Sequence, residues 1–478
     1  MKALPKNLFR AYDIRGMADE ELTSHNAYQI GRSIGSQLQE SGETQILLGR
    51  DGRISSPRIS KYLSQGLLNS GCHITDLGQI PTPVLYFAIR HLKIPNGIVV
   101  TGSHNAAEYN GIKIVFNGQC LHTDAITDLY KRIIKNNLVT GTTGKTTSLS
   151  LLNNYIDAVS KEVHLKRRLR IALDCSNGVT GLIATTLFEK IGCEVHALYC
   201  DLNGHFPNHS PDPTEPKNLQ DLQNLVIQKG LDIGIAFDGD GDRMIAVDGK
   251  GKILWPDRIM ALLAKNILQQ HPDRNVVYDV KCSQLLPKAI LNAGGNPLIS
   301  ISGHSLLKAH MKKTQAIMGG EFSGHIILND RSWGYADDGL YVAARLLELL
   351  SCYSETPTQI FAKLPDSYST PEYKLYFDSP QKAVEGITAF RKNYSLAGAK
   401  ITCIDGLRAD FDDCWGLARS SNTSPTITLR FEATTQRRLN FIQDLFRKNL
   451  QQLNLDVIKY NGFDLKNTDR KESVKVTV

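Results

Sequence analysis

Three aspartates at alternate positions are the clearest chemical signal in this sequence of 478 residues. They stand in 238-DGDGDR-243, between an alternating apolar stretch at 231–237 and a second apolar stretch at 244–248. The intervening glycines let the backbone turn tightly, so the carboxylates can converge from one loop. Converging carboxylates repel one another unless a hard cation neutralises them. We therefore predict a divalent metal site whose ligands are Asp238, Asp240 and Asp242.

The choice of metal follows from the ligand atoms and from the spacing of the loop. All-oxygen ligation favours Mg²⁺ or Ca²⁺. A calcium-binding EF-hand loop needs glycine at its sixth position and glutamate at its twelfth, but Arg243 and Gly249 stand there. Mg²⁺ is therefore the prediction, and a solvated acidic turn is the alternative.

A serine in the stretch 101-TGSHNAAEYNGIKI-114 is the second candidate. The G-x-S-x-G pattern of a serine hydrolase is absent, and in an extended segment the side chain of His104 would point away from that of Ser103. We therefore do not expect a catalytic triad. A serine that accepts and donates a phosphoryl group needs a metal, and cations around the phosphate oxygens. The aspartate loop offers the metal, and Lys113 and Arg243 are candidate cations; a plain turn serine is the alternative.

Two further loops offer groups suited to a phosphorylated sugar. In 319-GGEFSGH-325, an extended backbone would place Glu321 and Ser323 on one face, where both can accept hydrogen bonds from sugar hydroxyls. In 419-RSSNT-423, an arginine with hydroxyl and amide donors would suit a phosphate. The residues of this predicted phosphate cradle are Arg419, Ser421, Asn422 and Thr423. Singly, each loop could equally be an ordinary polar turn, and it is the joint occurrence of four such sites that indicates a phosphosugar.

These loops need a scaffold, and the sequence predicts an α/β protein of several domains. Three segments share an apolar strand, a polar loop and an amphipathic helical stretch, and they begin at Ile46, Ile171 and Val276. Such units place loops at the carboxyl ends of strands, where open sheets bind ligands. The C-terminal part alternates between strand and turn signals and then becomes helical from Gln436, which predicts a smaller α+β domain. The predicted domains are 1–148, 149–252, 253–366 and 367–460, followed by a polar tail at 461–478.

The composition fits a soluble protein and argues against several other classes. Hydrophobic residues make up 41% of the chain, and the net charge is +7 with no long basic block, so we expect no nucleic-acid partner. Nine cysteines at irregular spacing lack a C-x-x-C pair, which favours free thiols in a reducing cytosol over a zinc site or a disulfide framework. The N-terminus lacks the apolar core of a secretory signal, and no apolar run is long enough to span a bilayer. We expect a cytoplasmic monomer with a small-molecule substrate and no membrane contact.

The four motifs together resemble those of the α-D-phosphohexomutases. TGSHN, DGDGDR, GEFSGH and RSSNT occur in this order, and supporting stretches include 9-FRAYDIRG-16, 49-GRDGRISSP-57 and 303-GHSLLK-308. Within that family the chain is similar to the bacterial phosphomannomutase/phosphoglucomutase branch. The resemblance implies an α/β fold of three related mixed α/β domains around a central cleft, plus a smaller C-terminal α+β domain. It also implies the reversible interconversion of hexose 1-phosphate and hexose 6-phosphate, of mannose or glucose, through an active-site phosphoserine.

The resemblance assigns a role to each predicted site. It implies that Ser103 is the phosphoserine and that one of its phosphate oxygens holds Mg²⁺ together with the three aspartates. Glucose 1,6-bisphosphate or mannose 1,6-bisphosphate is the implied activator and intermediate. Glu321 and Ser323 would bind sugar hydroxyls, and the cradle at 419–423 would bind the phosphate that is not reacting. The implied catalytic residues are Ser103, Arg15, Lys113 and His325. The implied substrate-binding residues also include Tyr12, Arg243, Lys281, His304 and Lys308.

Two departures from the common family pattern bear on the branch and on the rate. Ala106 and Ala107 follow Asn105 where the family commonly has proline, which should loosen the serine loop slightly. Gly102 and Phe322 stand where phosphoglucosamine mutases usually have alanine and glutamine, so the mannose and glucose branch is favoured over that alternative. A catalytically silent phosphosugar-binding protein is the second alternative, although the serine and the three aspartates, one of which it would be expected to lack, are all present.

Overall fold

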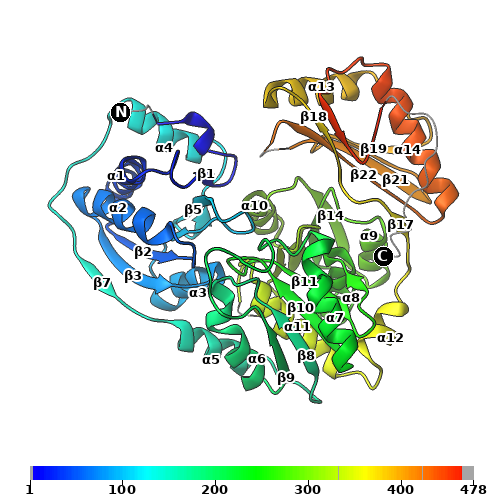
Figure 1. Ribbon diagram of the computed structural model, residues 1–478, viewed down its shortest axis with the longest axis horizontal. Coiled ribbons are helices and arrows are strands. Elements are labelled where there is room, and N and C mark those ends of the chain that lie inside the picture. The colour runs from blue at the N-terminus through cyan, green and yellow to red at the C-terminus, as the bar shows by residue number, and fades with distance from the viewer. Residues whose placement is uncertain (1–3, 332, 422–423, 466–478) are drawn as a thin grey trace.

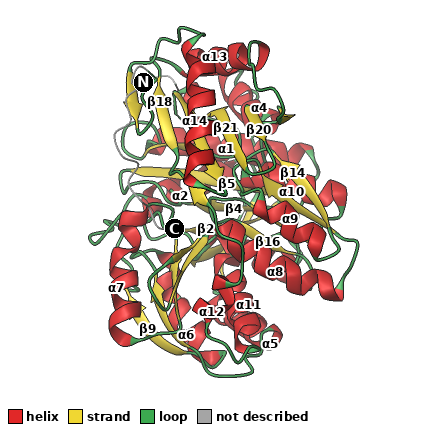
Figure 2. Ribbon diagram, turned by 90° about the vertical axis from the view of Figure 1, so that its right-hand side faces the viewer, coloured by secondary structure: helices red, strands yellow, loops and turns green. Residues whose placement is uncertain are grey.

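Four β-sheets, which follow one another in sequence order, organise the computed structural model (Figure 1). The structure describes residues 4–331, 333–421 and 424–465. In Figure 1 the N-terminal sheet (blue) and the C-terminal sheet (orange to red) lie at opposite upper sides, with the two middle sheets below them. Helices (red in Figure 2) cover the strands (yellow). Within the described ranges, no helix combines the length and the apolar character needed to cross a membrane.

The first sheet has seven strands and is flanked by four helices. The strands are β1 (Ile14–Met17), β2 (Gln45–Arg50), β3 (His73–Gln79), β4 (Gly97–Val100), β5 (Tyr109–Phe116), β6 (Gln119–Cys120) and β7 (Thr146–Ser148). The helices are α1 (Ser24–Glu40), α2 (Ser56–Asn69), α3 (Thr82–Leu92) and α4 (Asp124–Ile134). The strand order is β1-β5-β4-β2-β3-β7, with β6 paired to β5. β4, β2, β3 and β7 are parallel, and β5 is antiparallel to β4 and β1.

The second and third sheets are smaller versions of the same arrangement. The second contains β8 (Arg170–Asp174), β9 (Glu194–Leu198), β10 (Ile233–Phe237), β11 (Met244–Asp248) and β12 (Ile253–Leu254), with α5 (Leu152–Glu162), α6 (Ala184–Lys190) and α7 (Gln220–Lys229). The third contains β13 (Asn275–Asp279), β14 (Asn296–Ser300), β15 (Met318–Gly320) and β16 (Ile326–Leu328). Its helices are α8 (Pro256–Gln270), α9 (Leu285–Asn292), α10 (His304–Thr314), α11 (Gly339–Ser351) and α12 (Pro357–Ala362). The orders are β12-β11-β10-β8-β9 and β14-β13-β15-β16.

The fourth sheet is antiparallel throughout and carries two helices. Its strands are β17 (Tyr368–Ser369), β18 (Tyr373–Tyr376), β19 (Lys400–Thr402), β20 (Leu407–Asp410), β21 (Cys414–Ser420), β22 (Thr426–Ala433) and β23 (Lys459–Asn461). Its helices are α13 (Pro380–Lys392) and α14 (Gln436–Gln451). This all-antiparallel sheet differs from the three mixed sheets before it, so the predicted contrast between three related domains and a smaller α+β domain is confirmed.

All four motif loops occupy the same place in their sheets, the turn between two antiparallel strands. The loop at 101–108 joins β4 to β5, and the loop at 238–243 joins β10 to β11. The loop at 321–325 joins β15 to β16, and the motif at 419–423 starts at the end of β21, before β22. In the first three sheets the strand before the loop also pairs with a parallel neighbour. The first three motifs therefore lie at the carboxyl ends of parallel strands, where open sheets bind ligands.

The strands sort their residues between two faces, which explains why helices lie on both sides of the first sheet. Ile46 and Leu48 of β2 pack in a core with residues of α1, α2 and α4, whereas Leu47 packs in a second core with residues of α3. The second core continues through β8, β10, α8 and α11. The first three domains therefore share a continuous apolar core, and the units predicted from Ile46, Ile171 and Val276 are confirmed as β2, β8 and β13 with their following helices.

The same alternation gives the fourth sheet a core face and a face toward the third domain. Ile427, Leu429 and Phe431 of β22 pack in the core with residues of α13 and α14. The residues between them, Thr428 and Arg430, have the opposite orientation. Thr428 lines the cavity described below, and the guanidinium carbon of Arg430 lies 3.4 Å from the ring centroid of Phe322 in the third domain.

Arg408 of β20 fastens the fourth domain to the third. Its NH1 nitrogen donates to the carbonyl oxygens of Val280 and Cys282, over 2.6 Å in each case. The guanidinium carbon lies 3.9 Å from the ring centroid of Trp415, and the charge is balanced by Asp410, with the closest approach at 2.8 Å. All three guanidinium nitrogens of Arg408 thus have hydrogen-bond partners, although the residue is only 2% exposed.

The predicted tail begins later than expected from composition. Phe463 and Leu465 are 1% and 5% exposed and belong to the core of the fourth domain, so 461–465 is part of that domain. The rest of the predicted tail, 466–478, lies outside the described residues. The other predicted boundaries stay predictions.

We expect Arg408→Met to loosen the contact between the third and fourth domains. Methionine can still pack against Trp415 but leaves two backbone carbonyls without their donor, and each such charge-assisted bond contributes about 1.5–3 kcal/mol. Limited proteolysis should then cleave the connecting segment at 363–372 severalfold faster than in the unmodified protein. Arg391→Met, on the exposed side of α13, is the matched control and should leave cleavage unchanged. Equal cleavage of all three proteins would contradict the role given to Arg408.

Candidate active site

Ser103 lies between β4 and β5, and its hydroxyl reaches the aspartate loop of the second domain. The backbone of Ser103 is left-handed, with φ of 50°, and the residue is 1% exposed. Oγ donates a hydrogen bond to Oδ2 of Asp238 over 2.9 Å. The amide of Ser103 donates to Oγ1 of Thr101 over 2.9 Å, which stabilises the turn. The predicted serine and the first predicted metal ligand are therefore in direct contact.

The expected orientation of His104 is wrong. An extended segment would have turned the two side chains to opposite sides, but the left-handed φ of Ser103 bends the chain. As a result Nδ1 of His104 lies 3.3 Å from Oγ of Ser103. Burial, with the nearby positive charges, lowers the pKa of His104 well below its ordinary value, so the imidazole beside the serine is neutral.

Lys113 of β5 enters the aspartate loop from the first domain. Its Nζ donates to Oδ2 of Asp240 over 2.7 Å and to Oδ2 of Asp242 over 2.5 Å. Burial alone would lower the pKa of Lys113, but the carboxylates outweigh it and raise the pKa above its ordinary value. Burial and the charges of the other two carboxylates raise the pKa of Asp238. Burial also acts to raise the pKa of Asp240, but Lys113 more than offsets it and holds that pKa low.

The three carboxylates fit a hard divalent cation. Their ligand oxygens lie within 4.8 Å of one another, and all three residues are fully buried. Oδ1 of Asp240 and Oδ1 of Asp242 have no hydrogen-bond partner among the residues that the structure describes. Buried anionic oxygens without donors are costly, and an all-oxygen set matches what Mg²⁺ prefers. A bound cation would supply the missing partner.

Gly239 lets the aspartate loop and the serine loop touch backbone to backbone. A Cβ atom on Gly239 would lie 2.5 Å from the carbonyl oxygen of Ser103, closer than any side chain allows. Glycine at this position therefore permits the hydrogen bond between Ser103 and Asp238.

Arg53, which belongs to the supporting stretch 49–57, holds the serine loop in place. It is 1% exposed, its charge is balanced by Asp51 at 3.1 Å, and its guanidinium donates to four carbonyl oxygens at 2.5 to 3.0 Å. The four carbonyls belong to Ser103, Asn105, Ala106 and Tyr109. Side-chain hydrogen bonds thus hold the loop in which alanines replace the common proline.

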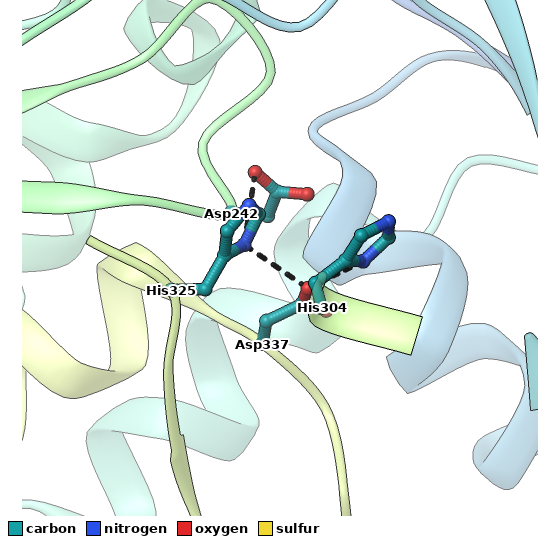
Figure 3. Close-up of side chains that lie close together, drawn as sticks. All are labelled: Asp242, His304, His325 and Asp337. Atoms are coloured by element: carbon teal, nitrogen blue, oxygen red, sulfur yellow. Dashed lines mark hydrogen bonds and ion pairs between the residues drawn. The ribbon is translucent and has the colours of Figure 1, made fainter. Parts of the chain in front are cut away.

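Asp337 lies between two histidines beside the aspartate loop (Figure 3). Its Oδ2 is 3.0 Å from Nδ1 of His304 and 3.1 Å from Nδ1 of His325, and the two rings stack with centroids 5.1 Å apart. Nδ1 of His325 also lies 3.6 Å from Oδ1 of Asp242. Burial lowers the pKa of both histidines. Their orientation is therefore set by a carboxylate, which Lys308 balances at 2.5 Å.

Two predicted arginines stand near the serine. Arg243 donates through Nε to Nε2 of His325 over 2.9 Å, which leaves Nδ1 as the protonated nitrogen that faces Asp337. Arg15 pairs with Asp13 at 2.5 Å and donates to the side chain of Asn105 in the serine loop. Arg15, Arg243 and Lys113 are thus cations on the cavity wall that also contains Ser103.

The opposite end of the site is formed by the third and fourth domains. Oε1 of Glu321 accepts a hydrogen bond from the amide of Gly303 over 2.6 Å, and burial raises the pKa of this carboxyl. Nε of Arg419 donates to Oδ2 of Asp405 over 3.0 Å. Lys281 pairs with a glutamate of the fourth domain, Glu372, at 3.4 Å. Two residues of the predicted phosphate cradle, Asn422 and Thr423, lie outside the described residues.

A cavity of about 290 Å³ joins these groups, close to the lower end of the range for small-molecule sites. Residues from all four domains line it. The predicted site residues along its wall are Tyr12, Arg15, Ser103, Lys113, Arg243, Lys281, His304, Glu321, Ser323, His325, Arg419 and Ser421. The three aspartates lie behind Ser103, in contact with it or with Lys113.

Four family models match the chain in sequence order. They describe phosphoglucomutase/phosphomannomutase alpha/beta/alpha domain I at residues 6–139, domain II at 153–251 and domain III at 255–368, and the C-terminal domain at 373–449. The chain belongs to the phosphoglucomutase/phosphomannomutase family. Each of the four family domains contributes residues to the cavity.

Individual members of the family match nearly the whole chain. A phosphomannomutase/phosphoglucomutase of Pseudomonas syringae pv. tomato is 43% identical over 454 residues, which cover 95% of this chain and 97% of the relative. A phosphoglucomutase of Neisseria meningitidis serogroup A is 41% identical, with 94% and 97% covered. A crystal structure of a family protein from Burkholderia thailandensis superposes with a TM-score of 0.90 at 40% identity, and covers 95% of this chain and 99% of that one.

Lys308, one of the expected cleft residues, lies elsewhere in this family member. It lines a neighbouring cavity, where Nζ lies 4.1 Å from the ring centroid of Tyr86 and 3.4 Å from Sγ of Cys120. The geometry makes Lys308 a partner of Asp337 behind the cleft, not part of the cleft wall.

Several residues of the site gave no recognisable sequence signal. They are Asp337, Asp405, Glu372, Lys374 and Thr428. In 336-ADDG-339, for example, a pair of acids before a helix signals an N-cap. Asp338 is that cap, because its side chain accepts from the amide of Tyr341 over 2.9 Å. Only the folded chain turns the adjacent Asp337 toward the histidines.

We expect Arg53→Met to release the serine loop and destabilise the first domain. Removing one member of a buried ion pair leaves Asp51 without compensation, which costs about 3–5 kcal/mol. Hydrogen exchange of the amides at 101–109 should accelerate at least tenfold. Arg50→Met is the matched control, since Arg50 is partly exposed and 3.9 Å from its acidic partner, and should change stability by less than about 1 kcal/mol. Unchanged exchange in Arg53→Met would refute the role of Arg53 in holding the loop.

Proposed function

We propose that the chain is a phosphohexomutase that interconverts the 1-phosphates and 6-phosphates of glucose, mannose or both. Ser103 would carry the phosphoryl group, and a hexose 1,6-bisphosphate would be the bound intermediate. One observation carries the proposal: the hydroxyl of Ser103 opens into a cavity lined by all four domains while it hydrogen bonds to Asp238 of a buried three-carboxylate cluster. Membership of the family supports the same reaction.

The proposed reaction has two phosphoryl transfers in opposite directions. In the first, the free hydroxyl oxygen of the sugar phosphate attacks the phosphorus on Oγ of Ser103. The bond from phosphorus to Oγ breaks, a bond from phosphorus to the sugar oxygen forms, and the sugar hydroxyl loses its proton. In the second, the other phosphoryl group of the bisphosphate returns to Oγ. Such transfers depend on in-line positioning and on charge neutralisation.

Mg²⁺ is the proposed metal, and Asp238, Asp240 and Asp242 would hold it together with an oxygen of the Ser103 phosphate. When bound, it would act as a Lewis acid and make the serine oxygen a better leaving group. Lys113 supports this arrangement, because it pairs with the Oδ2 atoms of Asp240 and Asp242 and leaves their Oδ1 atoms for the metal.

Three cations would stabilise the transferring group, and a histidine would accept the proton. Lys113 keeps its proton because the carboxylates raise its pKa, so we assign it, with Arg15 and Arg243, an electrostatic role. His325 is the proposed proton acceptor. Asp337 holds its Nδ1, so Nε2 is the nitrogen that would accept, after exchanging its hydrogen bond with Arg243 for one with the sugar.

The far end of the cavity would hold the part of the substrate that is not reacting. Glu321 and Ser323 are the proposed acceptors for sugar hydroxyls. The cradle of Arg419, Ser421, Asn422 and Thr423 is proposed to bind the distal phosphate. The bisphosphate must turn end for end between the two transfers, and this cradle would accept either phosphate. Because one chain supplies residues from all four domains to the cavity, we also propose that the protein acts as a monomer. Its free thiols support the further proposal that it works in the reducing cytoplasm.

Phosphorus NMR provides the test of the reaction. With Mg²⁺ and a trace of glucose 1,6-bisphosphate, glucose 1-phosphate or mannose 1-phosphate should convert to the 6-phosphate, and the two rates would rank the sugars. Ser103→Ala should lower the rate to background, because the phosphoryl carrier is lost. Ser148→Ala, exposed on β7, should match the unmodified protein. If neither sugar reacts but glucosamine 1-phosphate does, the chain is a phosphoglucosamine mutase; if none reacts, it is a silent phosphosugar-binding protein.

Removal of the metal provides a second test. Dialysis against EDTA should reduce interconversion to background, and added Mg²⁺ should restore it. Calorimetry should detect Mg²⁺ binding to the unmodified protein, and this binding should weaken at least tenfold in Asp242→Asn, which removes one anionic ligand from an oxygen-only site. Full activity in EDTA would overturn the proposed metal requirement.

A further inference from the structure

Two cysteines of the second domain form a close thiol pair. Cys175 follows β8 and Cys200 follows β9, and these strands are parallel neighbours (Figure 1). Sγ of Cys200 lies 3.2 Å from Sγ of Cys175, and both cysteines are free thiols. The amide of Cys175 donates to the carbonyl of Leu198 over 3.2 Å, so the backbone holds the two segments together.

We propose that Cys175 and Cys200 are a dithiol site oxidised by hydrogen peroxide, and that its disulfide slows phosphoryl transfer at Ser103. The effect on transfer rests on the proposed function, whereas formation of the disulfide does not. A disulfide has sulfurs about 2.0 Å apart. The pair must therefore close by roughly 1 Å, which is a small movement for side chains that already touch.

The surroundings of the two thiols determine which of them reacts with peroxide first. Cys175 is fully buried, and Cys200 is partly exposed, so peroxide meets Cys200 first. The hydrogen bond between the two thiols lowers the pKa of Cys200, while that bond and burial raise the pKa of Cys175. The thiolate of Cys200 is therefore the nucleophile toward peroxide, and Cys175 is the resolving thiol.

The proposed oxidation balances in two steps. The sulfur of Cys200 attacks one peroxide oxygen, the O–O bond breaks, and Cys200 becomes a sulfenic acid while hydroxide leaves. The sulfur of Cys175 then loses its proton and attacks the sulfur of Cys200. The S–S bond forms, the S–O bond breaks, and the departing hydroxide takes up a proton to become water. Two electrons pass from the thiols to one molecule of hydrogen peroxide.

Cys175 is connected to the aspartate loop through the backbone. Ser176, the next residue, donates from Oγ to the carbonyl of Phe237 over 2.8 Å, directly before Asp238. The amide of Val179 donates to the carbonyl of Gly239 over 3.1 Å. A Cβ on Gly178 would lie 2.7 Å from the same oxygen, so no side chain separates the two loops. Movement of Cys175 therefore reaches the proposed metal loop directly.

Cys200 is connected to the serine loop through the segment that follows it. A Cβ on Gly52 would lie 2.1 Å from the side chain of Leu202, so this segment packs against the loop of Arg53. The ring of Phe206 lies 4.9 Å from the guanidinium carbon of Arg53. Arg53 in turn holds four carbonyls of the serine loop. Both ends of the proposed disulfide thus act on the contact between Ser103 and Asp238.

Peptide mass spectrometry tests the oxidation without requiring any activity. The full-length reduced protein is treated with hydrogen peroxide, the remaining free thiols are blocked, and tryptic peptides are analysed. We expect peptide 171–190, which contains Cys175, to be linked to peptide 191–217, with the loss of two hydrogen atoms. The second peptide also contains Cys193, so fragmentation must place the link at Cys200. Cys352 is exposed and serves as the internal control for peroxide exposure.

The rate measurement tests the effect on transfer. A misplacement of about 1 Å can cost about a hundredfold in rate, so we expect oxidation to lower the rate at least tenfold and dithiothreitol to restore it. Cys200→Ser should keep the activity of the reduced protein and lose its sensitivity to peroxide. Cys175→Ala should behave in the same way, which guards against a folding defect in either variant. Cys352→Ser, the matched control, should stay sensitive.

Three results would overturn the proposal. The first is oxidised Cys352 without a link between Cys175 and Cys200. The second is a complete link with an unchanged rate. If the reduced protein has no mutase activity, the proposed function is wrong, but the disulfide proposal can still be tested. In that case, hydrogen exchange of the amides at 238–243 is compared between the reduced and the disulfide-linked protein. Unchanged hydrogen exchange of these amides in the linked protein would be the third result that overturns the proposal.

Discussion

The insertion of Lys113 between two carboxylates of another domain is the interaction on which the rest of the site depends. Three aspartates in one buried loop repel one another, and Lys113 from the first domain balances two of them at 2.7 and 2.5 Å. Breaking such a pair by removing one partner costs about 3–5 kcal/mol. Because the lysine and the aspartates belong to different domains, this neutralisation also aligns the domains. The hydrogen bond between Ser103 and Asp238 then follows from that alignment.

A second layer of buried charges sets the positions of the groups around this contact. Arg53 directs four loop carbonyls, and Asp337 fixes the rings of His304 and His325. Ion pairs at the surface contribute little to the free energy of unfolding. In a buried site, by contrast, a charged group left without its partner lowers that free energy substantially. The chain therefore tolerates one arrangement of these side chains. That rigidity suits a reaction whose rate depends on the position of one phosphoryl group.

The fourth domain is positioned by β22, whose side chains point alternately to the two faces of the sheet. One face of the strand supplies the core with α13 and α14, and the other supplies Thr428 to the cavity and Arg430 to Phe322. The packing that stabilises the domain thereby also orients its contribution to the site. Arg408 adds the polar contact that fastens the domain to the third.

The sequence by itself determined the α/β class and the four motif loops, because glycine spacing and alternating apolar residues act over a few residues. It could not determine contacts between distant segments. Arg53 and Asp337 lie far along the chain from the loop carbonyls and the histidines that they bind, and they meet these partners only when the first and third domains fold. The sequence also did not show the bend at Ser103, which brings His104 toward the serine, where an extended segment would have turned it away. Cys175 and Cys200 share no motif, yet adjacent strands place their sulfurs 3.2 Å apart. Local patterns report burial and turns, whereas pairing across sheets and domains depends on three-dimensional packing, which only the tertiary structure decided.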